Sequence, residues 1–245
     1  MARFNFVFKP ALIPSLAFLV VFPVLIMLGN WQLNRADEKR GIEQGVVNAI
    51  AKPPLLINES DLSTLKDEVY RPARLVGRFD NGRQYLWDNK TNKGRSGYQV
   101  LTPFFLDGLQ QVVMINRGWI PILGRRDEFQ DIAVTEAVAS IDGVIKTPSN
   151  AIQLAERIEE DEINYPSVIQ AFEPSVFATQ LGVEILPIMI ELSPESPQGY
   201  VREWQPYFGK IGKHMGYAMQ WFIMAFIAFF LYIKLNTKRR QDNLT

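Results

Sequence analysis

The sequence contains few side chains that could act as nucleophiles or metal ligands. Cysteine is absent, and His214 is the single histidine. The absence of cysteine excludes disulfides, thiolate metal sites, iron–sulfur ligation and a cysteine nucleophile. A catalytic triad or a multi-histidine metal site would have to be built around one ring or not at all. Any chemistry that needs an imidazole therefore depends on His214.

His214 lies three residues before an apolar run, Tyr217–Ile233. A neutral imidazole in this position could ligate a metal or a haem iron. The alternative is a polar residue at a membrane surface, extending toward lipid headgroups beside Lys210 and Lys213. One histidine cannot supply two histidine axial ligands to haem. A methionine, a water molecule or another subunit would have to complete the coordination.

A second group of candidate residues lies in the segment Asn116–Pro121. The guanidinium of Arg117 could bind a carboxylate or phosphate through two parallel hydrogen bonds. Trp119 could stack on a ligand or lie at a membrane interface. The alternative is the end of a β-strand, in which Gly118 permits a turn and Pro121 closes it. This structural interpretation is favoured by the residues alone.

The sequence carries none of the common catalytic motifs. It has no G-x-S-x-G elbow, phosphate-binding loop, H-E-x-x-H zinc motif or G-x-G-x-x-G dinucleotide motif. Its 26 basic and 26 acidic residues give a formal charge of zero, which argues against a general nucleic-acid binder. We therefore expect neither an enzyme nor a nucleic-acid partner. A membrane-anchored hydrolase that uses carboxylates stays open as an alternative.

The elements that must position these residues include two apolar runs. Ala11–Leu28 has no charged residue, and as a helix it would be about 27 Å long, close to the ~30 Å hydrocarbon core of a bilayer. Tyr217–Ile233 is also uncharged, and Gln220 is its one strongly polar residue. Two buried core helices at opposite ends of a polar chain are the weaker alternative. We expect two transmembrane helices, with Gln220 facing a protein neighbour or the other helix.

The charges around the two runs predict their orientation. Lysine and arginine precede the first run and follow the second, so the positive-inside rule places both termini in the cytoplasm. The first run is too long for a typical signal peptide, and no A-x-A-like cleavage site follows it. The acidic segment between the runs fits a bacterial periplasmic domain or a mitochondrial intermembrane-space domain, and the lack of an Arg/Ser-rich amphipathic presequence favours the bacterial case. We expect a two-pass protein of the bacterial inner (plasma) membrane, in contact with membrane lipid.

The middle of the chain is rich in strand-forming residues between turns. The first helix should continue over 31–51 and end at Lys52-Pro53-Pro54. A helix is expected from Pro174 to a stop at Gly182, and a short helix over 61–70. Residues 155–164 fit a helix or a loop. Strands are expected at 71–79, 84–88, 98–106, 111–116, 137–146 and 185–192.

Turn residues separate these strands. Asp107-Gly108 is a good hairpin turn, Gly94–Gly97 is interpreted as a turn, and Asp142-Gly143 as a bulge or turn. The expected fold is an α+β membrane protein, in which two transmembrane helices flank an antiparallel β-rich barrel or sandwich. The expected boundaries are cytoplasmic 1–10, transmembrane 11–30, periplasmic 31–213, transmembrane 214–233 and cytoplasmic 234–245.

Three segments together resemble a known family. Gly29–Arg35 with Lys39, the central pair Gly97–Pro103 and Asn116–Pro121, and His214–Phe222 are similar to motifs of the Surfeit-locus protein one family, the Shy-type cytochrome c oxidase assembly factors. Their order and spacing match over nearly the whole chain. The resemblance implies a role in building haem–copper terminal oxidases, by aiding haem a delivery to, or insertion into, the catalytic subunit. A membrane scaffold for oxidase subunits that binds no haem is the alternative.

The resemblance also implies ligands and partners. Some family members are reported to hold haem through a histidine that matches His214, so transient haem a binding is expected there. Arg117 is expected to neutralise a haem propionate, and Lys213 stands where the family often has asparagine. Cytochrome c oxidase subunit I and haem a synthase are the implied protein partners. We expect partner or interface roles for Trp31, Gln32, Arg35, Trp119, Tyr217, Gln220 and Trp221.

Overall fold

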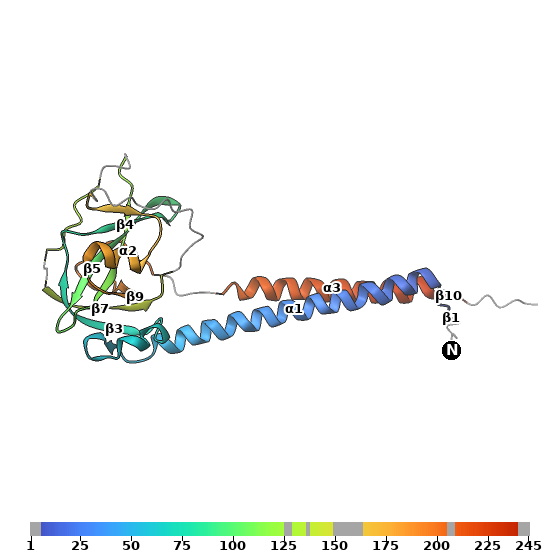
Figure 1. The fold of residues 1–245 in the computed structure, drawn as a ribbon. Coiled ribbons are helices and arrows are strands. Elements are labelled where there is room, and N and C mark those ends of the chain that lie inside the picture. Colours follow the sequence, from blue (N-terminus) through green and yellow to red (C-terminus); the bar gives the residue numbers. More distant parts are fainter. Residues whose placement is uncertain (1–5, 125–128, 136–137, 149–163, 205–208, 240–245) are drawn as a thin grey trace, which may run out of the picture. The chain divides into compact units, whose positions relative to one another are not determined.

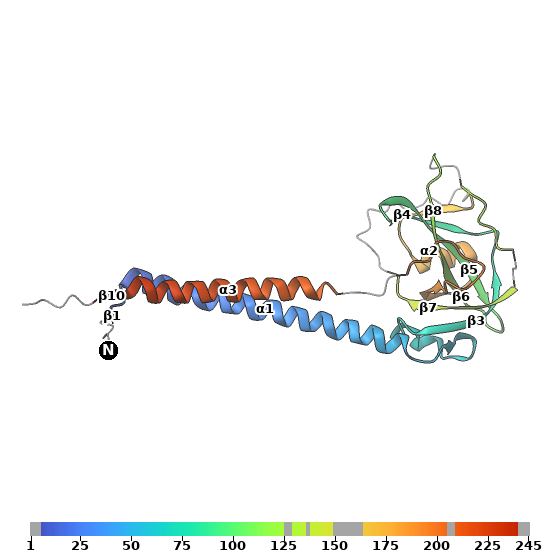
Figure 2. The ribbon, with the colours of Figure 1, turned by 180° about the vertical axis from the view of Figure 1, so that it is seen from behind.

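The computed structural model describes residues 6–124, 129–135, 138–148, 164–204 and 209–239. The chain divides into two compact units, and each is considered by itself. The helical unit comprises Met1–Gly45 and Tyr207–Thr245, and the β unit comprises Val46–Pro206. Figures 1 and 2 show the elements of both units from opposite sides.

Two long helices form the helical unit. Helix α1 spans Leu12–Ile50 and helix α3 spans Ile211–Asn236. They lie side by side and antiparallel in both views (Figures 1 and 2). The predicted continuation of the first helix beyond residue 30 is confirmed, and α1 ends just before Lys52-Pro53-Pro54. Pro23 lies inside α1 without ending it, which is tolerated in a helix of this type.

The two helices pack through ring stacking and small residues. Phe18 stacks on Tyr232 with ring centroids 4.4 Å apart. A Cβ on Gly29 would lie 2.6 Å from the ring of Phe222, so glycine is needed for this close approach. Covered positions of α1 recur at alternating intervals of three and four residues, the spacing of a left-handed helix pair. They are Ser15, Phe18, Phe22, Leu25, Gly29, Gln32, Ala36 and Lys39.

A two-stranded sheet, which we call the clasp, joins the start of α1 to the end of α3. Strand β1 (Phe6–Phe8) pairs antiparallel with β10 (Thr237–Arg239). Asn236 is 1% exposed, and its Oδ1 accepts a hydrogen bond from Ala11 N at 2.7 Å. Its Nδ2 donates to Tyr232 O at 2.8 Å. The end of α3 is therefore fixed to the start of α1, which the sequence pattern had not indicated.

Both helices are long and apolar enough to cross a membrane. The most apolar 18-residue window has a mean hydropathy of 2.5 in α1 and 1.8 in α3. Only 6% and 11% of these windows is buried inside the structure. The alternative of two buried core helices is therefore wrong, because α1 and α3 cover each other along one face only and most of their remaining apolar surface is exposed in the described part of the chain. The chain is a membrane-anchored protein.

In its described residues, the β unit is an eight-stranded sheet with one α-helix and two short 3₁₀ helices. The sheet order is β2-β3-β7-β9-β6-β5-β4-β8, and β3 also pairs with β5. The strands are β2 (Leu55–Leu56), β3 (Pro72–Phe79), β4 (Tyr85–Asn92), β5 (Arg95–Leu106), β6 (Val112–Pro121), β7 (Val138–Lys146), β8 (Ser167–Ile169) and β9 (Ile185–Leu192). The helices are η1 (Ile57–Glu59), η2 (Leu62–Asp67) and α2 (Pro174–Leu181).

Five of these strands close into a barrel. The extra pairing joins residues 77–79 of β3 to residues 104–106 of β5 and completes the ring β3-β7-β9-β6-β5, with Gly77 opposite Leu106. Apolar residues from all five strands form one core inside the ring, and Ile57 and Leu65 from the 3₁₀ helices complete it. A second core lies between the sheet and α2, around Tyr85 and Phe177. The predicted α+β barrel with flanking helices is confirmed, although β6–β9, β4–β8 and β2–β3 are parallel pairs.

Most predicted elements are present, with two local differences. The turn predicted at Gly94–Gly97 lies one residue earlier, because Lys93 and Gly94 take the positive φ angles and Arg95 already begins β5. Asp142-Gly143 is neither a bulge nor a turn, since β7 pairs with β3 in regular register through it. Gly143 is required because a Cβ would overlap Ile190. The short helix over 61–70 is the 3₁₀ helix η2, whose N-cap is Asp61.

The helix predicted from Pro174 is confirmed as α2, and Gly182 ends it in the left-handed conformation with φ of 68°. Its buried face carries Phe177 and Leu181. The segment 155–164 lies outside the described residues except for Asn164. The sequence therefore predicted the positions of most helices and strands, but it did not predict the order in which the strands pair.

The closure of the barrel can be tested at Gly77. A Cβ at this position would overlap the carbonyl oxygen of Phe105, which is backbone and cannot rotate away. We expect Gly77→Ala to lower the free energy of unfolding by about 2–4 kcal/mol. Thermal unfolding of the purified chain in detergent, followed by tryptophan fluorescence, measures this change.

Gly82→Ala is the matched control, because the nearest atom to a Cβ there is Asp80 Oδ1 at 3.4 Å. We expect its Tm to stay near that of the wild type. A Gly77→Ala variant as stable as Gly82→Ala would contradict the assignment of Gly77 to the closing pair.

Candidate functional site

His214 lies in the first turn of α3 and contacts α1 through one hydrogen bond. Its Nδ1 is 2.8 Å from Oε1 of Gln32. An amide oxygen only accepts hydrogen bonds, so the proton of a neutral His214 ring resides on Nδ1. Nε2 then carries the free lone pair, and none of the described residues makes a hydrogen bond to it. This is the protonation state in which an imidazole binds a metal.

The two residues meet because both lie on the facing stripes of the helix pair. Gln32 follows Gly29 by three residues, and His214 precedes Ala218 by four. Gly29 and Ala218 are small and covered by the neighbouring helix, so the two backbones come close at this level. Any residue with a larger side chain at either position would separate the amide from the imidazole.

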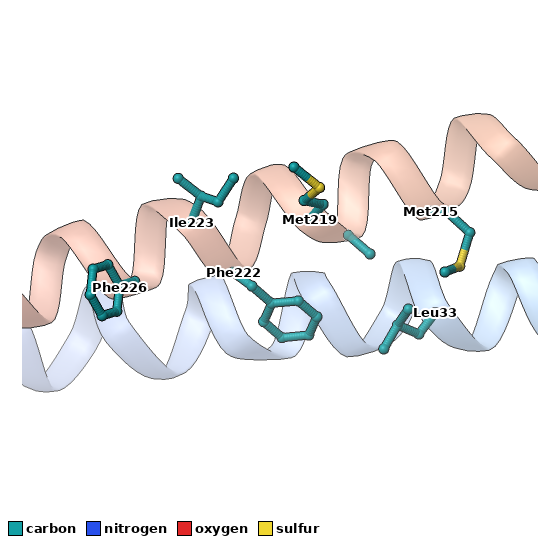
Figure 3. Close-up of a pocket in the computed structure, with 7 residues that line it drawn as sticks. Leu33, Met215, Met219, Phe222, Ile223 and Phe226 are labelled. Carbon is teal, nitrogen blue, oxygen red and sulfur yellow. The ribbon is translucent and has the colours of Figure 1, made fainter.

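An apolar groove begins one residue after His214. It has a volume of about 450 Å³, and it lies along α3 with one wall residue, Leu33, from α1. Figure 3 shows Leu33 and Met215 on opposite helices near one end of this groove. The other lining residues are Ala218, Met219, Phe222, Ile223 and Phe226. The volume is within the range of small-molecule sites, and the lining suits an apolar group.

Basic side chains surround the end of the helix pair that carries His214. Lys210 and Lys213 are exposed, and neither forms an ion pair with a described residue. Arg35 is paired with Glu38 at 2.5 Å on the surface of α1. A ligand with carboxylate groups would find unpaired ammonium groups next to the apolar groove. The site combines one imidazole, an apolar wall and two cations.

Arg117 belongs to the β unit and is buried, with 2% of its surface exposed. Its Nε donates to Gln198 O at 2.7 Å, and its Nη1 donates to Gln84 Oε1 at 2.9 Å and Ile132 O at 2.6 Å. The Tyr200 ring lies 5.2 Å from the guanidinium carbon. Burial lowers the pKa of Arg117 below its usual range.

These contacts favour the structural interpretation of Arg117 over anion binding. Its acceptors are uncharged oxygens from four segments of the β unit, so the guanidinium holds these segments together. A propionate could reach it only if the domain opened. Arg117 and His214 lie in different units.

Trp119 is also a structural residue of the β unit. It is 9% exposed, and its Nε1 donates to Lys90 O at 3.2 Å. Gly97 lies against its indole, and Gly118 takes a φ of 114° where Val201 O lies 2.8 Å from its Cβ position. The structural alternative for this segment is correct in that β6 ends at Pro121, but Gly118 makes no turn: the strand continues through it, beside an irregularity in the pairing of β6 with β5. The indole is not exposed for an interface role.

The remaining predicted interface residues lie on the helix pair. Trp31 is 57% exposed and Tyr217 is 51% exposed, whereas Trp221 is half-buried. Gln220 is exposed, so it does not face the other helix of its own chain. Of the two neighbours predicted for Gln220, α1 is therefore excluded.

Sequence reasoning missed the groove and the role of Gln32 as a partner of His214. Two signals could have indicated them. Met215 and Met219 are four residues apart and directly follow the single histidine, so they share one face of a helix. Gln32 and His214 both lie near the same end of their antiparallel apolar runs, where polar residues at equal depth can meet.

Comparison with known proteins gives one family. A model described as the SURF1 family matches residues 19–226. A SURF1-like protein of Monosiga brevicollis is 22% identical over 236 residues, covering 91% of this chain and 87% of that protein. An uncharacterised SURF1-like protein of Mycobacterium bovis is 21% identical, covering 98% of this chain and 91% of that protein. A SURF1-like protein of Rickettsia bellii is 29% identical over 108 residues, covering 43% of this chain and 42% of that protein.

The structural role of Arg117 gives a testable expectation. Arg117→Leu leaves buried oxygens of Gln84, Ile132 and Gln198 without their donor. We expect the free energy of unfolding to fall by about 2–4 kcal/mol. Thermal unfolding in detergent measures the change.

Arg74→Leu is the control. Arg74 and Asp142 form an ion pair in which both side chains are 52% exposed, so its loss should change the free energy of unfolding much less than the loss of Arg117. Equal stability of the two variants would contradict a structural role for Arg117.

Proposed function

The chain belongs to the SURF1 family, and we propose that it assists the assembly of haem–copper cytochrome c oxidase by delivering haem a to, or inserting it into, the catalytic subunit. The family match spans most of α1, the whole β unit and the first half of α3. It therefore includes Gln32, His214 and all seven residues that line the groove. The resemblance of the three sequence motifs to oxidase assembly factors supports the same role.

The observation that carries the proposal is the hydrogen bond between His214 and Gln32. It is 2.8 Å long and assigns the proton to Nδ1, which leaves Nε2 available as a ligand. A histidine that only sits among headgroups would need no such orientation. The paired imidazole, at the start of a membrane helix and next to an apolar groove, suits a ligand that is partly metal and partly apolar.

The residues around His214 fit haem in three respects. Haem supplies an iron atom that accepts a nitrogen ligand, an apolar ring system and two carboxylates. Nε2 of His214 would hold the iron, the groove residues from Met215 onward would contact apolar parts, and Lys210 and Lys213 would face the carboxylates. Arg117 takes no part, because it is buried in the β unit.

Weak binding suits a delivery role. His214 is the residue at this end of the helix pair that would hold the iron, through Nε2. A ligand held at one position by one imidazole can exchange to a receiving protein more readily than one held on both sides.

The proposed location follows the charge pattern. The termini lie in the cytoplasm, the β unit in the bacterial periplasm, and both helices in the inner membrane. The groove then opens into the lipid layer on its periplasmic side, where integral membrane partners can reach it. Subunit I of the oxidase is the proposed recipient, and haem a synthase is the proposed donor. The chain acts without turnover of its own, as a chaperone for the cofactor.

Haem content of the purified protein tests the proposal. We expect wild-type protein from haem a-producing cells to carry haem, and His214→Ala to lose most of it, as measured by the pyridine haemochrome spectrum. Equal haem in both proteins would exclude His214 as the ligand. Absence of haem from both, with co-purified oxidase subunits, would favour the alternative of a scaffold.

Gln32→Leu tests the orienting hydrogen bond. Loss of a partner of this kind typically weakens metal binding about 10- to 100-fold, and we expect haem affinity to fall within this range. Asn34→Leu is the matched control, because Asn34 is an exposed amide on the same helix. Similar haem affinity in Gln32→Leu and Asn34→Leu would show that the hydrogen bond has no functional role.

A further inference from the structure

The clasp lies where both helices leave the hydrocarbon layer. The uncharged run of α1 begins at Ala11, and that of α3 ends at Ile233. Strands β1 and β10 lie directly outside these two points, and the hydrogen bond from Ala11 N to Asn236 Oδ1 holds them together. The clasp is therefore at the level of the lipid headgroups.

The two faces of the clasp differ in their chemistry. Paired residues of an antiparallel sheet share a face, and successive residues of a strand alternate between faces. Val7 and Lys238 are paired and share one face. Phe6 and Phe8 lie on the other face and are 58% and 50% exposed. The ring of Phe8 packs edge-on against Tyr232, with ring centroids 5.9 Å apart. An element with an apolar face and a cationic face favours the boundary between acyl chains and headgroups.

Three exposed lysines gather at the clasp. Lys9 follows β1, and its backbone N donates to Asn236 O at 2.7 Å. Lys9 is two residues beyond Val7, which is paired with Lys238, so the two lysines are diagonal neighbours with Cα atoms about 7–8 Å apart. Lys234 lies in the last turn of α3. None of the three forms an ion pair with a described residue, and residues 6–36 and 209–239 contain no aspartate or glutamate.

This arrangement gains stability from a bound anion. A two-stranded sheet is only marginally stable by itself, and this one has three residue pairs. The neighbouring ammonium groups of Lys9 and Lys238 repel each other across it. An anion between them replaces that repulsion by two charge-assisted hydrogen bonds, one to each strand. The exposed rings of Phe6 and Phe8 require in addition that the ligand has an apolar part.

We propose that the clasp binds the headgroup of an anionic phospholipid. The phosphate lies between Lys9 and Lys238, with Lys234 adding to the positive potential, and the two phenylalanine rings contact the acyl chains. An anionic phospholipid is complementary to both faces, whereas a free phosphate matches only the lysines. The site is independent of the proposed function, because it lies at the end of the helix pair opposite to His214.

Native mass spectrometry tests the proposal. The full-length protein is released from nanodiscs that contain equal amounts of phosphatidylglycerol and phosphatidylcholine, and the ratio of the two retained lipids is measured. We expect the wild type to retain mostly phosphatidylglycerol. Lys9→Gln combined with Lys238→Gln should lower the ratio about five- to twentyfold, since each lysine near an anionic surface contributes about a factor of five. Lys66→Gln combined with Arg95→Gln removes the same charge from exposed positions of the β unit and should leave the ratio unchanged.

Val7→Pro separates the folded clasp from its charges. Proline cannot donate to a strand ladder, so this variant loses the pairing of β1 with β10 but keeps every lysine. We expect it to lower the lipid ratio as the double substitution does, and Val7→Ile to retain the wild-type ratio. A wild-type ratio in Val7→Pro or in the Lys9 and Lys238 double variant would overturn the proposal. Displacement of the lipid by inorganic phosphate, but not by chloride of equal ionic strength, would also overturn it.

Discussion

A polar group within a bilayer must find its hydrogen-bond partner in the protein, and the helical unit is arranged around that requirement. Ser15 shares a hydrogen bond of 3.0 Å with Tyr232, Gln32 binds His214, and Asn236 binds the backbone of Ala11. These three pairs lie at successive levels along α1 and α3. They set the register between two surfaces that are otherwise apolar, and that register places an imidazole beside an amide at one end.

The polar side chains of the two units differ in how many hydrogen-bond partners they have. In the β unit, Arg117 is surrounded by uncharged acceptors from several segments, and each bond strengthens the domain. In the helical unit, the one described hydrogen bond of His214 joins its Nδ1 to Gln32. Its Nε2 makes no hydrogen bond with a described residue. Arg117 thus stabilises a fold, whereas His214 is the side chain that would hold the ligand in the function we propose. Both are polar residues in apolar surroundings, and only their partners distinguish them.

The sequence predicted where helices and strands begin and end better than it predicted which strands pair and which side chains meet. Apolar run length and the residues Pro174 and Gly182 were enough to place α1, α3 and α2, because helix signals are local. The parallel pairing of β6 with β9 was not accessible, since strands 60 residues apart carry no local mark of their pairing. Arg117 was ambiguous for the same reason: its acceptors Gln84 and Gln198 come from distant segments. Gln32 was recognised as part of a motif, but its contact with His214 required the register of the pair.

The clasp formed by β1 and β10 limits how the two helices can move. Three residue pairs join these strands, and Asn236 ties the end of α3 to the first turn of α1. Sliding of one helix past the other would break all of these bonds together. The hydrogen bond between Gln32 and His214 holds the two helices together near the other end of the pair. The clasp therefore fixes the longitudinal register that brings Gln32 and His214 to the same level.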